Sequence, residues 1–133
     1  MNDVKLPRPT DSELGILRVL WRRGPSTVRE VHEALREASG GDAGSGYTTT
    51  LKLMQIMTDK GLVVRDESQR AHVYAARASE QRTQHQLVSD LLERAFGGSP
   101  AQLAMQALST RRTSPEELAQ LRQLLDSLEG EEQ

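Results

Sequence analysis

Residues 47–60 contain the side chains best suited to contact another molecule, because they predict a helix with one apolar and one polar side. The apolar side, which includes Met54 and Met57, suits packing against a core. The polar side offers hydroxyl, ammonium and amide groups, which can bind base edges in a DNA major groove as well as phosphates. An ordinary solvated helix face would have the same composition. The polar side chains are Thr48, Thr49, Lys52 and Gln55.

Two apolar residues lie toward this polar side. Leu51 could contact a thymine methyl group if the helix enters a major groove. Ile56 is expected to pack on a neighbouring element instead.

Further candidates for anion binding lie outside this helix. Arg65 and Arg70 flank a predicted hairpin loop at 65–72, where arginines can reach phosphates or a minor groove. Ser26 and Thr27 open another predicted helix. There they are expected to cap backbone N–H groups, and a phosphate could also bind.

The helices that position these residues have clear starts and ends. Two Thr-x-x-Glu patterns, beginning at Thr10 and Thr27, fit capping boxes and predict two helix starts. The first helix is expected to end at Gly24 and the second at about Ala38. A glycine-rich connector at 39–46 separates the second helix from the third.

The third helix is expected to end at Gly61, and two short segments rich in strand-forming residues follow at 62–65 and 72–75. Three helices and then a hairpin are typical of a winged helix-turn-helix domain. The sequence therefore predicts a mainly α fold with a small β-hairpin wing at residues 1–78, preceded by an irregular arm at 1–9.

Residues 79–133 are predicted to form three amphipathic helices, two of which begin with Ser-Pro pairs. Their apolar stripes have no obvious core of their own, which favours a C-terminal helical dimerisation region. A continuous monomeric helical domain is the alternative. The expected dimer contacts are Leu87, Leu91, Leu92, Phe96, Leu103, Leu118, Leu121, Leu125 and Leu128.

The composition narrows the possible partners. The chain has 133 residues, with 17 Lys and Arg against 19 Asp and Glu. Residues 1–82 carry 13 basic and 11 acidic side chains, whereas residues 83–133 carry 4 and 8, so an anionic partner would meet the first part. Only 3% of residues are aromatic, which argues against a stacking platform for single-stranded nucleic acid. The lack of a long apolar run predicts a cytoplasmic protein without membrane insertion.

An enzyme is not expected. The chain has no cysteine, which excludes disulfides and thiolate metal sites, and His32, His72 and His85 lack the local spacing of metal ligands. No nucleophile motif or phosphate-binding loop occurs. The sequence therefore predicts no catalytic residue, no metal site and no cofactor.

Four segments together resemble the BlaI/MecI/CopY family of bacterial repressors of β-lactamase, methicillin-resistance and copper genes. They are LGILRVLW at 14–21, STVREV at 26–31, YTTTLKLMQIMTDKGL at 47–62 and RD at 65–66. The resemblance implies a homodimer that represses transcription by binding an inverted repeat in double-stranded operator DNA. It also implies that 47–60 is the recognition helix, and by position it places the four polar residues above at the family's DNA contacts.

Three departures from the family pattern limit what can be carried over. The glycine-rich connector is longer than usual, and the lack of cysteine excludes the copper-sensing hook. Antibiotic-responsive members are inactivated when a membrane metalloprotease sensor cuts an Asn-Phe bond. Gln106 and Ala107 occupy that position here, so a regulatory cleavage region is implied but the same cleavage specificity is not expected. A protein-interaction adaptor that does not bind DNA is the alternative function, and an activator fits the same sequence.

Overall fold

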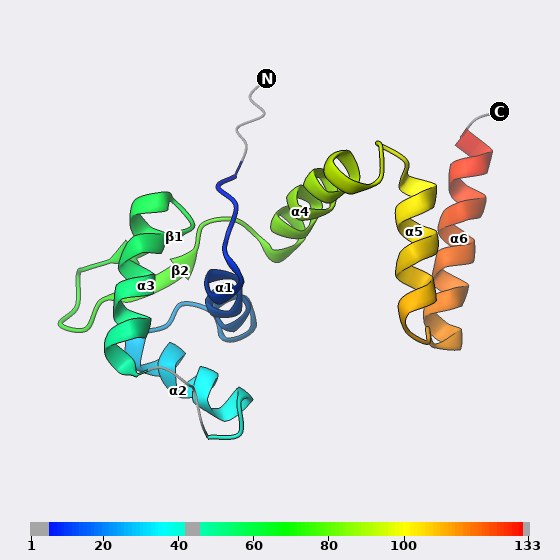
Figure 1. Cartoon of the computed structure of the whole chain (residues 1–133). Coiled ribbons are helices and arrows are strands. Elements are labelled where there is room, and N and C mark those ends of the chain that lie inside the picture. The colour runs from blue at the N-terminus through cyan, green and yellow to red at the C-terminus, as the bar shows by residue number, and fades with distance from the viewer. Residues whose placement is uncertain (1–5, 42–45, 132–133) are drawn as a thin grey trace. The chain divides into compact units, whose positions relative to one another are not determined.

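The computed structural model describes residues 6–41 and 46–131. The fold is mainly helical with one small antiparallel hairpin, as the sequence predicts (Figure 1). The middle of the glycine-rich connector and the first half of the N-terminal arm lie outside the described residues. The elements are α1 (Asp11–Arg23), α2 (Val28–Ala38), α3 (Tyr47–Lys60), β1 (Val63–Asp66), β2 (Val73–Ala76), α4 (Glu80–Ala95), α5 (Pro100–Thr110) and α6 (Pro115–Glu131).

Both predicted capping boxes are confirmed. The Thr10 hydroxyl accepts a hydrogen bond from the Glu13 backbone N–H, and the Glu13 carboxylate accepts one from the Thr10 backbone N–H. Thr27 and Glu30 make the same reciprocal pair at the start of α2. Each box satisfies backbone donors that have no partner inside the helix, so these two threonines fix where α1 and α2 begin.

The core of the first unit lies between α1, α2, α3 and the hairpin. The backbone of Ser26, in the turn between α1 and α2, pairs with that of Tyr74 in β2 through two hydrogen bonds of 2.9 and 2.8 Å. This bridge ties the hairpin to the helices. The buried apolar residues are Ile16, Leu17, Leu20, Val28, Val31, Met54, Met57, Leu62, Val63 and Tyr74.

The strands lie one residue later along the chain than the sequence predicts. Gly61, with a φ of 85°, adopts the left-handed conformation that ends α3. The Leu62 N–H then donates to the Met57 carbonyl at 2.9 Å, so Leu62 completes the helix end before β1 begins.

The chain divides into two compact units between Ser89 and Asp90, inside α4, whereas the sequence placed the boundary after residue 78. The first turns of α4 belong to the first unit because Thr83 is buried and lines a small cavity with Leu17 and Leu62. The indole N–H of Trp21 donates to the Ala78 carbonyl at 2.9 Å and holds the segment before α4.

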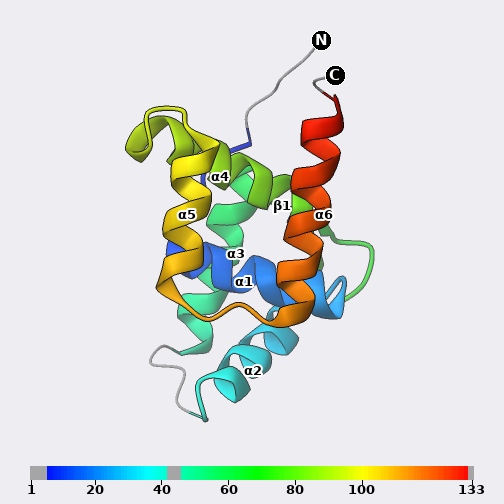
Figure 2. The same ribbon diagram turned by 90° about the vertical axis from the view of Figure 1, so that its right-hand side faces the viewer.

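In the second unit, α5 and α6 are joined by a short segment and run in opposite directions (Figure 2). None of the described residues of these two helices is buried. Leu103, Leu118 and Leu121 are half-buried, whereas Leu125 is 59% and Leu128 49% exposed. Apolar side chains of α6 are thus exposed to solvent. No helix in the described ranges combines the length and apolar composition needed to cross a bilayer.

Candidate nucleic-acid interface

The polar side of α3 is exposed, and its apolar side faces the core. Thr50, Met54 and Met57 are buried, while the four residues predicted to contact DNA are all exposed: Thr48, Thr49, Lys52 and Gln55. Helical periodicity therefore placed these side chains on the correct side. Leu51 is half-buried at the edge of this face.

The expectation that Ile56 packs on a neighbour is wrong. Its side chain is 40% exposed, and it follows the exposed Gln55 on the outer side of α3. Periodicity gives the direction of a side chain but not whether another element stands there. Ile56 adds an apolar group to the outer surface of this helix.

The start of α3 is held by two residues of α2. The His32 Nδ1 and Thr50 Oγ1 atoms are 3.1 Å apart, within hydrogen-bond distance. The His32 ring also meets the Tyr47 ring edge to face, with centroids 5.9 Å apart. The guanidinium of Arg29 lies 5.6 Å from the Tyr47 ring centroid, in cation–π range. The sequence did not single out Arg29 or Tyr47 as site residues.

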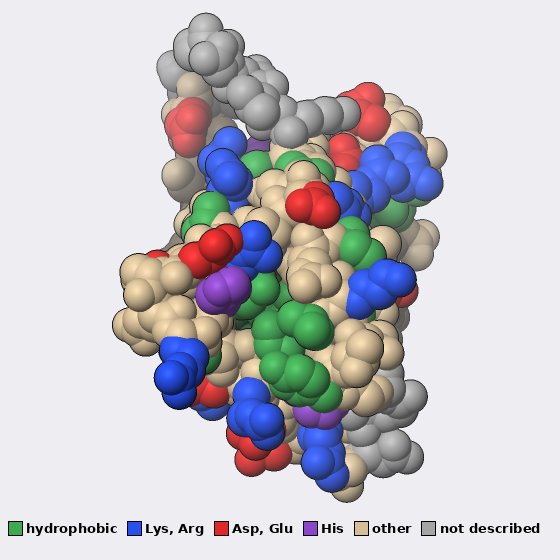
Figure 3. Space-filling view, turned by 90° about the vertical axis from the view of Figure 1, so that its left-hand side faces the viewer, with side chains coloured by type: hydrophobic (Ala, Val, Ile, Leu, Met, Phe, Trp, Pro, Cys, Tyr) green, Lys and Arg blue, Asp and Glu red, His purple; other side chains and the backbone are tan. Residues whose placement is uncertain are grey.

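A hollow of about 310 Å³, here called the wing hollow, opens where α2, α3 and the hairpin loop meet. Figure 3 shows the side of the molecule on which α3 and the hairpin lie, with hydrophobic side chains gathered near its middle and Lys, Arg and His side chains around them. The hollow combines apolar and cationic groups. Its lining residues are Thr27, Val28, Arg29, Tyr47, Leu51, Arg70, Ala71, His72 and Tyr74.

The two arginines predicted in the wing have different surroundings. Arg65 lies across the hairpin from Tyr74 and pairs with the Glu67 carboxylate at 2.8 Å. Hydrogen bonds with Tyr74 and Glu67 raise the pKa of Arg65 above its ordinary value. Arg70 is exposed and lines the wing hollow. The Arg65 guanidinium is therefore already paired with a carboxylate, whereas Arg70 lies at the wing hollow.

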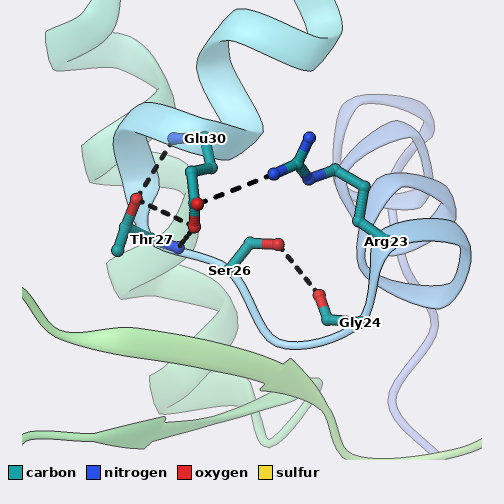
Figure 4. A network of polar contacts seen from close by, with 5 residues as sticks. All are labelled: Arg23, Gly24, Ser26, Thr27 and Glu30. Carbon is teal, nitrogen blue, oxygen red and sulfur yellow. Dashed lines mark hydrogen bonds and ion pairs between the residues drawn. The ribbon is translucent and has the colours of Figure 1, made fainter.

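Of the two residues expected to cap α2, Thr27 does so and Ser26 does not. Ser26 is buried, and its hydroxyl donates to the Gly24 carbonyl at 2.9 Å (Figure 4). Thr27 is half-buried and its hydroxyl accepts from the Glu30 N–H, while the Glu30 carboxylate also lies 3.6 Å from Arg23. Backbone pairing with β2 buries Ser26, which local sequence cannot reveal.

The predicted regulatory cleavage region lies on another helix, which belongs to the second unit. Gln106 and Ala107 are exposed on α5. Among the residues that the structure describes, no group of three or more His, Asp or Glu could hold a metal ion. The exposed face of α3 and the adjoining wing hollow are thus the main features available for binding.

Three helices, a hairpin bridged to the first turn and an exposed polar third helix define a winged helix-turn-helix protein. The model of a family described as penicillinase repressor matches residues 9–127. The chain belongs to this family, which confirms the resemblance seen in the sequence.

Relatives of known name agree with this assignment. The chain is 33% identical over 127 residues to a protein of Mycobacterium tuberculosis named transcriptional regulator BlaI, a match that covers 95% of this chain and 88% of that protein. It is 25% identical over 122 residues to the penicillinase repressor of Bacillus licheniformis, with 92% of each chain covered.

Proposed function

We propose that this chain is a transcriptional repressor that binds double-stranded operator DNA through α3. The exposed polar side of α3 is the observation that carries the proposal, because it presents donors and acceptors without burying any of them against the core. The family match and the names of the two relatives support repression as the outcome of binding.

In the proposed complex, α3 enters the major groove. Lys52 would favour guanine, Gln55 would favour adenine, and a threonine methyl group or Leu51 would contact a thymine methyl. Arg70 and the start of α2 at Thr27 would bind phosphates, which fix the register of the helix without reading sequence.

The second unit would hold two copies together. Its helices α5 and α6 have no buried residue among those described, and Leu125 and Leu128 are exposed on α6. A second copy would cover these side chains and present two copies of α3 to an inverted repeat, with half-sites about one helical turn apart or a multiple of it. A dimer that holds two weakly binding copies of α3 on one operator binds that operator more tightly than a single copy does.

Proteolysis in α5 is the proposed route to derepression. Cleavage between Gln106 and Ala107 would separate α6 from the rest of the dimerisation region. Both residues are exposed, but they lie inside a helix, so α5 would have to open locally before a protease could bind the chain in extended form. A membrane metalloprotease is the proposed sensor partner.

Gel-shift titration of the full chain tests DNA binding. The labelled probe is the promoter that precedes the chain's own gene, and the competitor is a random duplex of equal length. Repressor function predicts that the unlabelled promoter competes far better than the random duplex. Equal, weak competition by both would instead support a protein-interaction adaptor. Transcription in vitro from the same promoter then separates repression from activation.

A further inference from the structure

The wing hollow has a charge pattern unlike that of the whole chain. The chain carries a formal net charge of −2. Among the residues that line the hollow, two are arginines, one is a histidine and none is Asp or Glu. Arg29 comes from α2 and Arg70 from the hairpin loop, so two separate elements bring positive charge to one opening. This pattern suits an anionic ligand.

Arg29 is held in place before any ligand arrives. Its guanidinium lies 5.6 Å from the centroid of the Tyr47 ring. The His32 ring supports Tyr47 edge to face with an interplanar angle of 83°. A planar guanidinium over a ring can still direct its N–H groups at two phosphate oxygens. The contact with Tyr47 favours an Arg29 side chain that lies over the ring, at the opening of the hollow.

The floor of the hollow is apolar. Tyr47 is 41% exposed and Leu51 is half-buried, and both line the opening on the side of α3. The volume of about 310 Å³ lies at the lower end of the range of small-ligand sites, roughly 300–1,000 Å³. An opening of this size with cations and an apolar floor suits one sugar-phosphate unit.

We propose that the wing hollow seats one backbone phosphate of the operator together with its deoxyribose. Arg29 and Arg70 bind the phosphate, and Tyr47 and Leu51 pack against the sugar. This inference rests on the proposed DNA binding by α3 and adds Arg29 and Tyr47 to the interface. The contact does not depend on base sequence. It sets how far the start of α3 enters the groove, because Tyr47 is the first residue of that helix.

The salt dependence of DNA binding by the full-length protein tests the proposed phosphate contact in the wing hollow, here called the seat. Binding of the promoter probe and of a random duplex is measured by fluorescence anisotropy over a series of KCl concentrations. Arg29→Ala is expected to weaken binding to both duplexes by a similar factor, about tenfold, and to reduce the slope of log K against log salt by about 2, one for each subunit of the proposed dimer. Arg29→Lys keeps the charge but not the planar fork, so it should preserve the slope and lower the affinity.

Arg36→Ala is the matched control. Arg36 is exposed near the other end of α2, where its guanidinium donates to the Gly41 carbonyl, and it does not line the hollow. The Arg36→Ala substitution removes one positive charge from α2, as Arg29→Ala does, and should leave the slope of log K against log salt unchanged. Circular dichroism and thermal melting confirm that each variant is folded.

The outcomes separate the seat from the proposed function. A wild-type protein that binds neither duplex would overturn both. Promoter binding with the same salt slope in Arg29→Ala as in the wild type would overturn the seat alone. So would equal changes of slope in Arg29→Ala and Arg36→Ala, because the effect would then be one of overall charge.

Discussion

Lys60 Nζ lies 2.7 Å from Glu13 Oε1 and joins the last residue of α3 to the first turn of α1. The Glu13 side chain is 3% exposed and that of Lys60 32%. The same carboxylate oxygen accepts the Thr10 backbone N–H, so Glu13 serves the helix cap and the ion pair together. Because α2 holds the start of α3 through His32, the helix proposed to enter DNA is fixed at both ends.

The ion pair predicts a loss of stability in acid. Burial alone would raise the pKa of Glu13, but hydrogen bonds from Lys60 and Thr10 outweigh it and hold the pKa below its usual value of 4.5. A folded-state pKa below that of the unfolded chain stabilises the fold above the unfolded pKa, and this stability is lost as the pH falls through the folded pKa. Glu13→Gln keeps an oxygen for the Thr10 cap but removes the charge, and should cost about 1–3 kcal/mol at pH 7.

Urea unfolding from neutral pH downward measures this cost. The difference between Glu13→Gln and the wild type should shrink once the pH falls below 4.5 and the carboxyl takes up a proton. Glu33→Gln, at an exposed position of α2, is the control and should change stability little. A difference for Glu13→Gln that is the same at every pH would show that the charge is not the cause.

The cap of α2 predicts a second stability effect. Thr27→Ala removes the hydroxyl that accepts the Glu30 backbone N–H and should cost about 1 kcal/mol. Thr27→Ser restores an oxygen at the same place and should recover most of the loss. Chemical denaturation of the three proteins side by side measures the effect. A serine variant as unstable as the alanine variant would mean that the methyl group of Thr27, and not its hydroxyl, matters.

Lys52 distinguishes base reading from phosphate contact. Lys52 is exposed on the polar side of α3, and Lys52→Ala should cost about 1–3 kcal/mol of binding energy at the operator if the ammonium group reads a base. Competition with random DNA is the measurement. An equal loss on both duplexes would assign Lys52 to a phosphate. Arg18→Ala, an exposed charge on α1, controls for the change in net charge.

The second unit predicts a dimer that a single charge can break. Leu125 is 59% exposed on α6, and Leu125→Glu would place a carboxylate in the proposed contact between copies. Sedimentation velocity should show a dimer for the wild type and a monomer for this variant, with operator affinity reduced as well. Gln123→Glu adds the same charge at another exposed position of α6 and should remain dimeric. A dimeric Leu125→Glu protein would contradict this role for the leucine.

Local sequence predicted the features that depend on a few consecutive residues. The capping boxes at Thr10 and Thr27 involve groups three residues apart, so their pattern is complete within the sequence. The end of α3 at Gly61 was predictable for the same reason. The exposed face of α3 followed from helical periodicity together with the buried Met54 and Met57.

Features that depend on distant residues could not be predicted in this way. The burial of Ser26 results from pairing with Tyr74, and the contact of Arg29 with Tyr47 exists because α2 and α3 pack together. Neither contact can be inferred from the residues that neighbour it in the sequence. The compact first unit extends beyond residue 78, since Thr83, a polar residue of α4, is buried in it.

Trp21 is the only tryptophan of the chain, and its indole is tethered to the carbonyl just before α4. The fluorescence of this one ring therefore reports on the joint between the hairpin and the first turns of that helix. If the joint loosens while the rest of the domain stays folded, the emission maximum will move to longer wavelength before the far-ultraviolet ellipticity changes. The molecule thus carries its own optical probe of the segment that leads from the hairpin into α4.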